Sequence, residues 1–99
     1  MLNLYYKLKG LNITSTSSYT SGDYLYVVGE VSNNSGEDHD YMKVSVTLYN
    51  ESDNVIGVTT AYVDADTLRN GSSSPFKMMI GESDVSDISQ IKSIKLSIS

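Results

Sequence analysis

The chain has 99 residues, 39% of them hydrophobic, which suits a single domain with one two-layer core. Its formal net charge is −5, and its seven basic residues are spread along the sequence, which argues against a nucleic-acid-binding face or a surface for anionic lipid. It has no cysteine, so disulfides, thiolate metal sites and cysteine nucleophiles are excluded.

Residues Met1–Gly10 are predicted to form a lead-in segment or an extra edge strand, ahead of a single domain over residues 11–99. This segment is too short and too polar for a signal peptide or a membrane span. If the domain is exported, its signal or anchor lies outside this chain. Leu11–Ser15 is the predicted first strand, and the Ser/Thr-rich run that follows, up to Asp23, reads as a loop.

The stretch Tyr24–Asn50 is predicted to hold two strands, Tyr24–Asn33 and Tyr41–Asn50, joined by a polar turn. Apolar residues recur at every second position of each strand, which is the spacing of a sheet with one buried face. The predicted inward set is Leu25, Val27, Val31, Val44, Val46 and Leu48. Gly29 lies on the same face, where a missing side chain indicates close approach by a tyrosine or phenylalanine of the facing sheet. The two strands either pair directly or lie in opposite sheets, as Greek-key connections allow.

The second half of the chain is predicted to add three strands and one helical turn. Asn54–Ala65 has apolar residues on both faces, so its buried side stays open. The inward residues of Ser74–Gly81 and Ile91–Ser99 are predicted to be Phe76, Met78, Ile80, Ile94, Leu96 and Ile98. Gly71 is expected to supply a positive φ to a tight turn, and Asp84 to cap the helical turn. Six to seven short strands predict an all-β, immunoglobulin-like antiparallel β-sandwich.

Three local patterns resemble the FxLYD family of immunoglobulin-like modules. Val28–Gly36 is similar to the family's glycine-x-valine-x-asparagine strand end, Val46–Asn50 stands at the motif that names the family, and Leu68–Gly71 precedes Phe76 at the expected spacing. The sequence departs from the pattern with valine for phenylalanine at position 46 and asparagine for aspartate at position 50. The resemblance implies a non-catalytic module, often found in exported or envelope-attached proteins of bacteria and archaea.

Candidate chemistry is sparse. The only histidine, His39, lies in an acidic turn with Glu37, Asp38 and Asp40, and it reads as an ordinary solvated residue. The three carboxylates are the kind of hard oxygen ligand that calcium takes, so a calcium-dependent ligand-binding or adhesion domain is the alternative function. The sequence has no nucleophile elbow and no phosphate-binding glycine loop. We therefore predict no enzyme, and no catalytic, cofactor-binding or metal residue.

Tyrosines are the candidate contact residues. Tyr24, Tyr26, Tyr41 and Tyr49 occupy the outward positions of the central strands, and they form one aromatic patch if those strands are neighbours. Such a patch fits ordinary cross-strand stabilisation of the sheet first, and a contact surface for a partner second. Four N-x-S/T triplets, at Asn12, Asn33, Asn50 and Asn70, weakly favour an exported protein. The leading prediction is a non-catalytic structural or protein-interaction module of a larger exported or cell-surface protein. Its protein partner contacts the outward tyrosines or an edge strand, without nucleic acid or membrane insertion.

Overall fold

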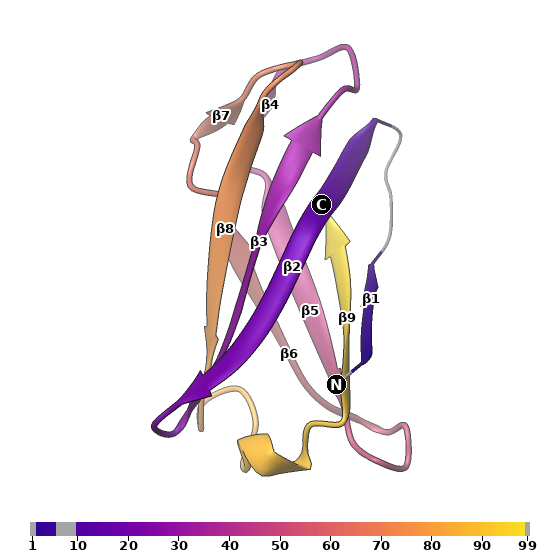
Figure 1. Ribbon diagram of the computed structural model, residues 1–99, viewed down its shortest axis with the longest axis vertical. Coiled ribbons are helices and arrows are strands. Elements are labelled where there is room, and N and C mark those ends of the chain that lie inside the picture. The colour runs from indigo at the N-terminus through magenta and orange to yellow at the C-terminus, as the bar shows by residue number, and fades with distance from the viewer. Residues whose placement is uncertain (1, 6–9, 99) are drawn as a thin grey trace.

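The computed structural model describes residues 2–5 and 10–98, and it is built almost entirely of strands in two layers (Figure 1). The strands are β1 (Leu2–Tyr5), β2 (Leu11–Ser21), β3 (Tyr24–Asn33), β4 (His39–Asp40), β5 (Lys43–Tyr49), β6 (Val55–Tyr62), β7 (Thr67–Leu68), β8 (Ser73–Ile80) and β9 (Ser93–Ile98). The remaining element is a single 3₁₀ turn, η1 (Ile88–Gln90). The chain is thus all-β, as predicted. Residues 6–9 of the predicted lead-in lie outside the described residues.

One sheet has four strands in the order β1-β9-β5-β6. β5 pairs antiparallel with both β6 and β9, whereas β1 runs parallel to β9 at the edge of the sheet. A register shift between Leu48 and Tyr49 marks an irregularity where β5 meets the start of β6. No helix in the described part of the chain is long and apolar enough to cross a membrane.

The other sheet has three antiparallel strands in the order β2-β3-β8. β2 continues to Ser21, so the prediction of a loop after Ser15 was wrong. Serine and threonine were read as loop residues there, but β3 pairs with the whole of this run as far as Ser21 opposite Tyr24. Gly22, with φ +59°, supplies the first central position of the tight two-residue turn that joins the strands.

β3 and β5 lie in opposite sheets, so the strands of the Tyr24–Asn50 stretch do not pair with each other. Of the two arrangements that the sequence left open, the structure has the one with the long connection. β4 lies in that connection, and it pairs with β7 from the segment between β6 and β8 to form a two-stranded sheet. The four tyrosines predicted to form one patch are therefore divided between the two layers.

The core lies between the two sheets, and the predicted inward faces are confirmed. Side chains from both layers form one buried hydrophobic cluster that includes every predicted inward residue: Leu25, Val27, Val31, Val44, Val46, Leu48, Phe76, Met78, Ile80, Ile94, Leu96 and Ile98. Along β6 the buried side changes. Ala61 is partly buried against the cluster and Val63, directly after the strand, is buried, whereas Val58 and Tyr62 are exposed. At the start of the strand Ile56 packs against the cluster and Val55 is exposed, next to the register shift in the β5–β6 pairing.

Gly29 is approached closely, as predicted, but by a neighbour in its own sheet. Gly29 on β3 is in register with Phe76 on β8, and a Cβ placed on Gly29 would lie 2.7 Å from the phenylalanine ring. It would also lie 2.4 Å from the backbone oxygen of Ser15. The glycine therefore makes room for an aromatic ring from an adjacent strand and for a backbone carbonyl of β2.

The helical turn exists, but Asp87 caps it and not Asp84. Asp87 accepts hydrogen bonds from the Ser89 hydroxyl at 2.7 Å and the Ser89 backbone N–H at 2.9 Å. These two bonds, the hydroxyl first, lower the pKa of the Asp87 carboxyl. Asp84 instead accepts the backbone N–H of Gly81, which closes the loop directly after β8. Aspartate is a favoured N-cap residue, so either Asp84 or Asp87 could cap a helical turn. Asp87 caps η1 because the turn begins at the residue that follows it.

Candidate functional site

The outer face of the three-stranded sheet carries a row of large side chains. Tyr19 on β2 is in register with Tyr26 on β3, and Tyr26 is in register with Met79 on β8. We call Tyr19, Tyr26 and Met79 the tyrosine row. The two tyrosine rings stack with centroids 5.1 Å apart and planes at 17°, and Tyr24 lies beside them, 6.3 Å from Tyr26.

A cation completes this row. The Lys77 ammonium lies 5.0 Å from the centroid of the Tyr26 ring, so Tyr26 has an aromatic ring and a positive charge as neighbours. Cross-strand aromatic pairs stabilise a sheet by about 0.2–1 kcal/mol each, and this stabilisation explains why Tyr26 stands at the middle of the row. Stabilisation of the sheet does not explain the large side chains at the two ends of the row, because Tyr19 is 46% exposed and Met79 is 54% exposed.

A shallow hollow of about 440 Å³ lies next to the row on the same sheet. It is lined by residues of all three strands together with Asp64: Ser15, Thr16, Ser17, Val28, Gly29, Glu30, Asp64, Pro75, Phe76 and Lys77. Glu30 and Asp64 give this hollow two acidic groups and Lys77 gives it one basic group, and Glu30 accepts a hydrogen bond from Thr14. The face thus combines apolar area with charges of both signs and hydroxyl groups, a mixture that protein-contact surfaces also have.

Only part of this row was predicted. Tyr24 and Tyr26 face outward here as expected, but Tyr41 precedes β5 and Tyr49 ends it, in the other layer. Tyr41 is exposed and has φ +52°, and Tyr49 is half-buried. Tyr19 was missed because it lies in the run read as a loop. Thr16, Tyr19 and Thr20 were the available signal for a strand, because β-branched and aromatic residues favour strands.

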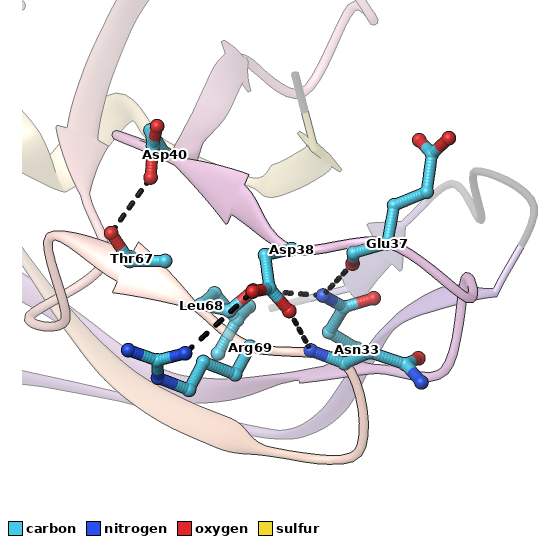
Figure 2. A network of polar contacts seen from close by, with 8 residues as sticks. Asn33, Glu37, Asp38, Asp40, Thr67, Leu68 and Arg69 are labelled. Carbon is cyan, nitrogen blue, oxygen red and sulfur yellow. Dashed lines mark hydrogen bonds and ion pairs between the residues drawn. The ribbon is translucent and has the colours of Figure 1, made fainter.

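A second cluster lies where β3 ends, and Asn33 is its centre (Figure 2). Asn33 is fully buried, and its amide nitrogen donates to the backbone oxygens of Glu37 at 2.7 Å and Leu68 at 2.8 Å. Its amide oxygen accepts from the backbone N–H of Ser35 at 3.0 Å and the Ser35 hydroxyl at 2.6 Å. We call Asn33, Ser35, Glu37 and Leu68 the Asn33 cluster. All four hydrogen-bonding positions of one amide are used, so the cluster ties the segment after β3 to β7.

The acidic side chains of the turn around this cluster have separate partners. Asp38 accepts the backbone N–H of Asn70 at 2.9 Å and lies 3.7 Å from the Arg69 guanidinium, whereas Asp40 accepts the Thr67 hydroxyl at 2.7 Å (Figure 2). Glu37 contributes its backbone oxygen to Asn33. Among residues 2–5 and 10–98, no three acidic or histidine side chains converge as metal ligands would. Of the three carboxylates suggested for calcium, those of Asp38 and Asp40 therefore make separate structural contacts.

Ser35 and His39 lie in hydrogen-bond contact, with 3.0 Å between the serine hydroxyl and histidine Nε2. A hydroxyl beside an imidazole is the pairing of a nucleophile and its base. The shortest contact of the Ser35 hydroxyl, however, is 2.6 Å to the Asn33 amide oxygen, which can only accept. This contact competes with His39 for the serine proton.

The asparagine side chains of the four N-x-S/T triplets differ in burial and in hydrogen bonding. Asn33 is inaccessible for glycosylation in the folded protein because it is fully buried. The amide oxygen of Asn12 is buried and has no hydrogen-bond partner among the described residues. Asn50 accepts from the backbone N–H groups of Ser52 and Asn54, and Asn70 accepts from that of Gly36. At three of the four triplets the asparagine amide thus has a local structural role.

No protein-family model matches the chain, and no curated protein matches it in sequence. Solved structures are similar in fold. A DUF1425 family member from Shewanella sp. pv-4 has a TM-score of 0.57 at 7% identity, over 90% of this chain and 76% of that one. Campylobacter jejuni cj0090 has a TM-score of 0.51 at 13% identity, over 97% of this chain and 94% of that one.

A third similar structure is a calcium-binding mutant of Bacteroides uniformis beta-glucuronidase 2. Its TM-score is 0.51 at 19% identity, and the match covers 77% of this chain but 8% of that one. In that enzyme the likeness is to one small part of a much longer protein. At identities this low the comparisons show the fold alone, and they define the chain as a small β-domain.

Proposed function

We propose that the chain is a non-catalytic protein-interaction module of a larger exported or cell-surface protein, with an immunoglobulin-like fold of the FxLYD kind. The FxLYD resemblance rests on its three motifs. The structure adds a reason for one of them, since Asn33 of the strand-end motif is the centre of the Asn33 cluster. A location outside the cell or in its envelope follows from the same resemblance.

The observation that carries the proposal is the tyrosine row. A domain stabilised by its interior has no need to keep Tyr19 and Met79 half-exposed in line with Tyr26 across one sheet. Stacking and the Lys77 contact hold the two tyrosine rings in place, so little conformational entropy of these rings would be lost when a partner binds. Tyrosine and methionine are also the residues that protein interfaces favour. We propose that a protein partner covers this row.

Paired variants on the two outer faces test the proposal. Tyr19→Ser with Met79→Ser removes both ends of the row, whereas Val58→Ser with Tyr62→Ser removes two side chains of equal 59% exposure from the opposite layer. Each protein is immobilised and offered surface proteins extracted from the source cells, after thermal melts have shown that both variants fold. We expect bound proteins to be lost with the first pair and kept with the second. The same bound set for both variants contradicts the proposal.

A further inference from the structure

The exposed turn after β7 contains a chemically labile pair, Asn70–Gly71. In an Asn-Gly sequence the glycine backbone nitrogen can attack Cγ of the asparagine side chain. A nitrogen–carbon bond forms, the bond from Cγ to the amide nitrogen breaks, ammonia leaves, and water opens the cyclic imide to aspartate or isoaspartate. Glycine offers no side chain to hinder this attack, and asparagine is among the thermolabile residues of proteins. Both residues of the pair are exposed to water.

The fold holds both reacting groups. The Gly71 N–H donates to the backbone oxygen of Asn33 at 2.6 Å, so the nucleophile is bonded to the buried residue of the Asn33 cluster. The Asn70 amide oxygen accepts the backbone N–H of Gly36 at 2.9 Å. The Asn70 backbone N–H donates to Asp38, also at 2.9 Å. The nucleophile is thus held by Asn33 at the end of β3, and the electrophile by Gly36 in the segment that follows.

We infer that Asn70 is a site of spontaneous deamidation. Its rate is set by local opening of the end of the domain where the segment after β3 meets the turn after β7. Attack requires the two atoms to approach in line, and the three hydrogen bonds above oppose the rotation that brings them together. When opening and closing are fast compared with the chemistry, the reaction rate follows the population of the open form. The hydrogen bonds from Asn33, Gly36 and Asp38 to this pair therefore delay the reaction.

The product differs from the starting protein in charge and in contacts. Deamidation adds one negative charge to a chain whose formal net charge is −5, beside the carboxylate of Asp38. Like charges at this distance weaken the contact between the segment after β3 and the turn after β7. The fraction of deamidated protein therefore increases with the total time that this end of the domain has spent in the open form.

The test follows the mass of the peptide that contains Asn70, in the folded protein and in the same chain unfolded by urea, at physiological pH and temperature. We expect the folded chain to react at least about tenfold more slowly, since a tenfold change corresponds to about 1.4 kcal/mol of local opening. Equal rates in the two states overturn the inference.

Two matched variants test the mechanism. Asp38→Ala removes the exposed carboxylate that accepts the Asn70 N–H, and Asp87→Ala removes an exposed carboxylate with the same role in η1. We expect Asp38→Ala to accelerate deamidation by about threefold or more through easier local opening, and Asp87→Ala to leave the rate unchanged. If Asp38→Ala reacts at the wild-type rate while thermal melts show both variants folded, the inference is wrong.

Discussion

At the scale of single residues, Asn33 shows how one buried amide can organise an end of a β-domain. Its four side-chain hydrogen bonds reach the two segments that flank the β4–β7 sheet. Its backbone adds bonds to Ser72 and Gly71. A buried polar group is costly unless it is fully paired, and this one is paired at every position. The interior amide therefore fixes one arrangement of the loops.

Replacing Asn33 by alanine tests this role. The change removes four hydrogen bonds and leaves the Leu68 backbone oxygen without its donor, so we expect a loss of about 2–4 kcal/mol in the free energy of unfolding. Urea denaturation measures it. Asn34→Ala is the matched control, because Asn34 is exposed and uses its backbone N–H toward Gly10, and it should cost less than about 0.5 kcal/mol. Equal costs for the two variants contradict the assignment.

Gly29 is constrained by space. We expect Gly29→Ala to lower the free energy of unfolding by about 1–3 kcal/mol, because the new methyl group meets the Ser15 carbonyl and the Phe76 ring. Gly71→Ala is the comparison, since its Cβ meets nothing within 4 Å and its cost arises from φ +86° alone. That cost is about 1 kcal/mol. Thermal melts should rank Gly29→Ala as the more destabilising, and the opposite ranking contradicts the crowding argument.

At the scale of elements, the length of β2 can be tested by hydrogen exchange. In a two-residue hairpin the pair that flanks the turn, Ser21 and Tyr24, is hydrogen-bonded, and hydrogen-bonded pairs alternate from there. Tyr19 is therefore bonded to β3 through its N–H, and the N–H of Thr20 points away from β3. We expect the Tyr19 amide to exchange at least about tenfold more slowly than that of Thr20. Equal and fast exchange at both would support a loop.

Sequence alternation was enough to predict the inward faces of β3, β5, β8 and β9, because burial on one face of a strand recurs at every second residue. It left the buried side of β6 open, and most of β2 was read as a loop. Strand pairing was not predictable in the same way. The strands that contain Leu25 and Val44 have the same alternation of apolar residues whether they are neighbours in one sheet or lie in opposite sheets. The Asn33 cluster was also out of reach, because one partner of Asn33 is 35 residues away and asparagine at a strand end reads as a turn residue.

At the scale of the whole molecule, the distribution of acidic groups leads to a prediction about calcium. Asp38 and Asp40 have separate partners, so ion binding would have to break contacts that the fold already uses. A ligand that binds the native state raises the midpoint of thermal unfolding by mass action. We expect melts with and without millimolar calcium to coincide. A midpoint that rises with calcium concentration, and is lost in Asp38→Ala, contradicts this expectation and revives the adhesion hypothesis.

The parallel pairing of β1 with β9 has a mechanical consequence. The N-terminal end of β1 lies toward one end of the molecule and the C-terminal end of β9 toward the other (Figure 1). Tension applied to the chain before β1 and after β9 pulls these two strands in opposite directions along their shared ladder. All the hydrogen bonds of that ladder are then loaded together in shear, and none can be opened singly from one end. In a surface protein under stretch, such a domain yields late and abruptly.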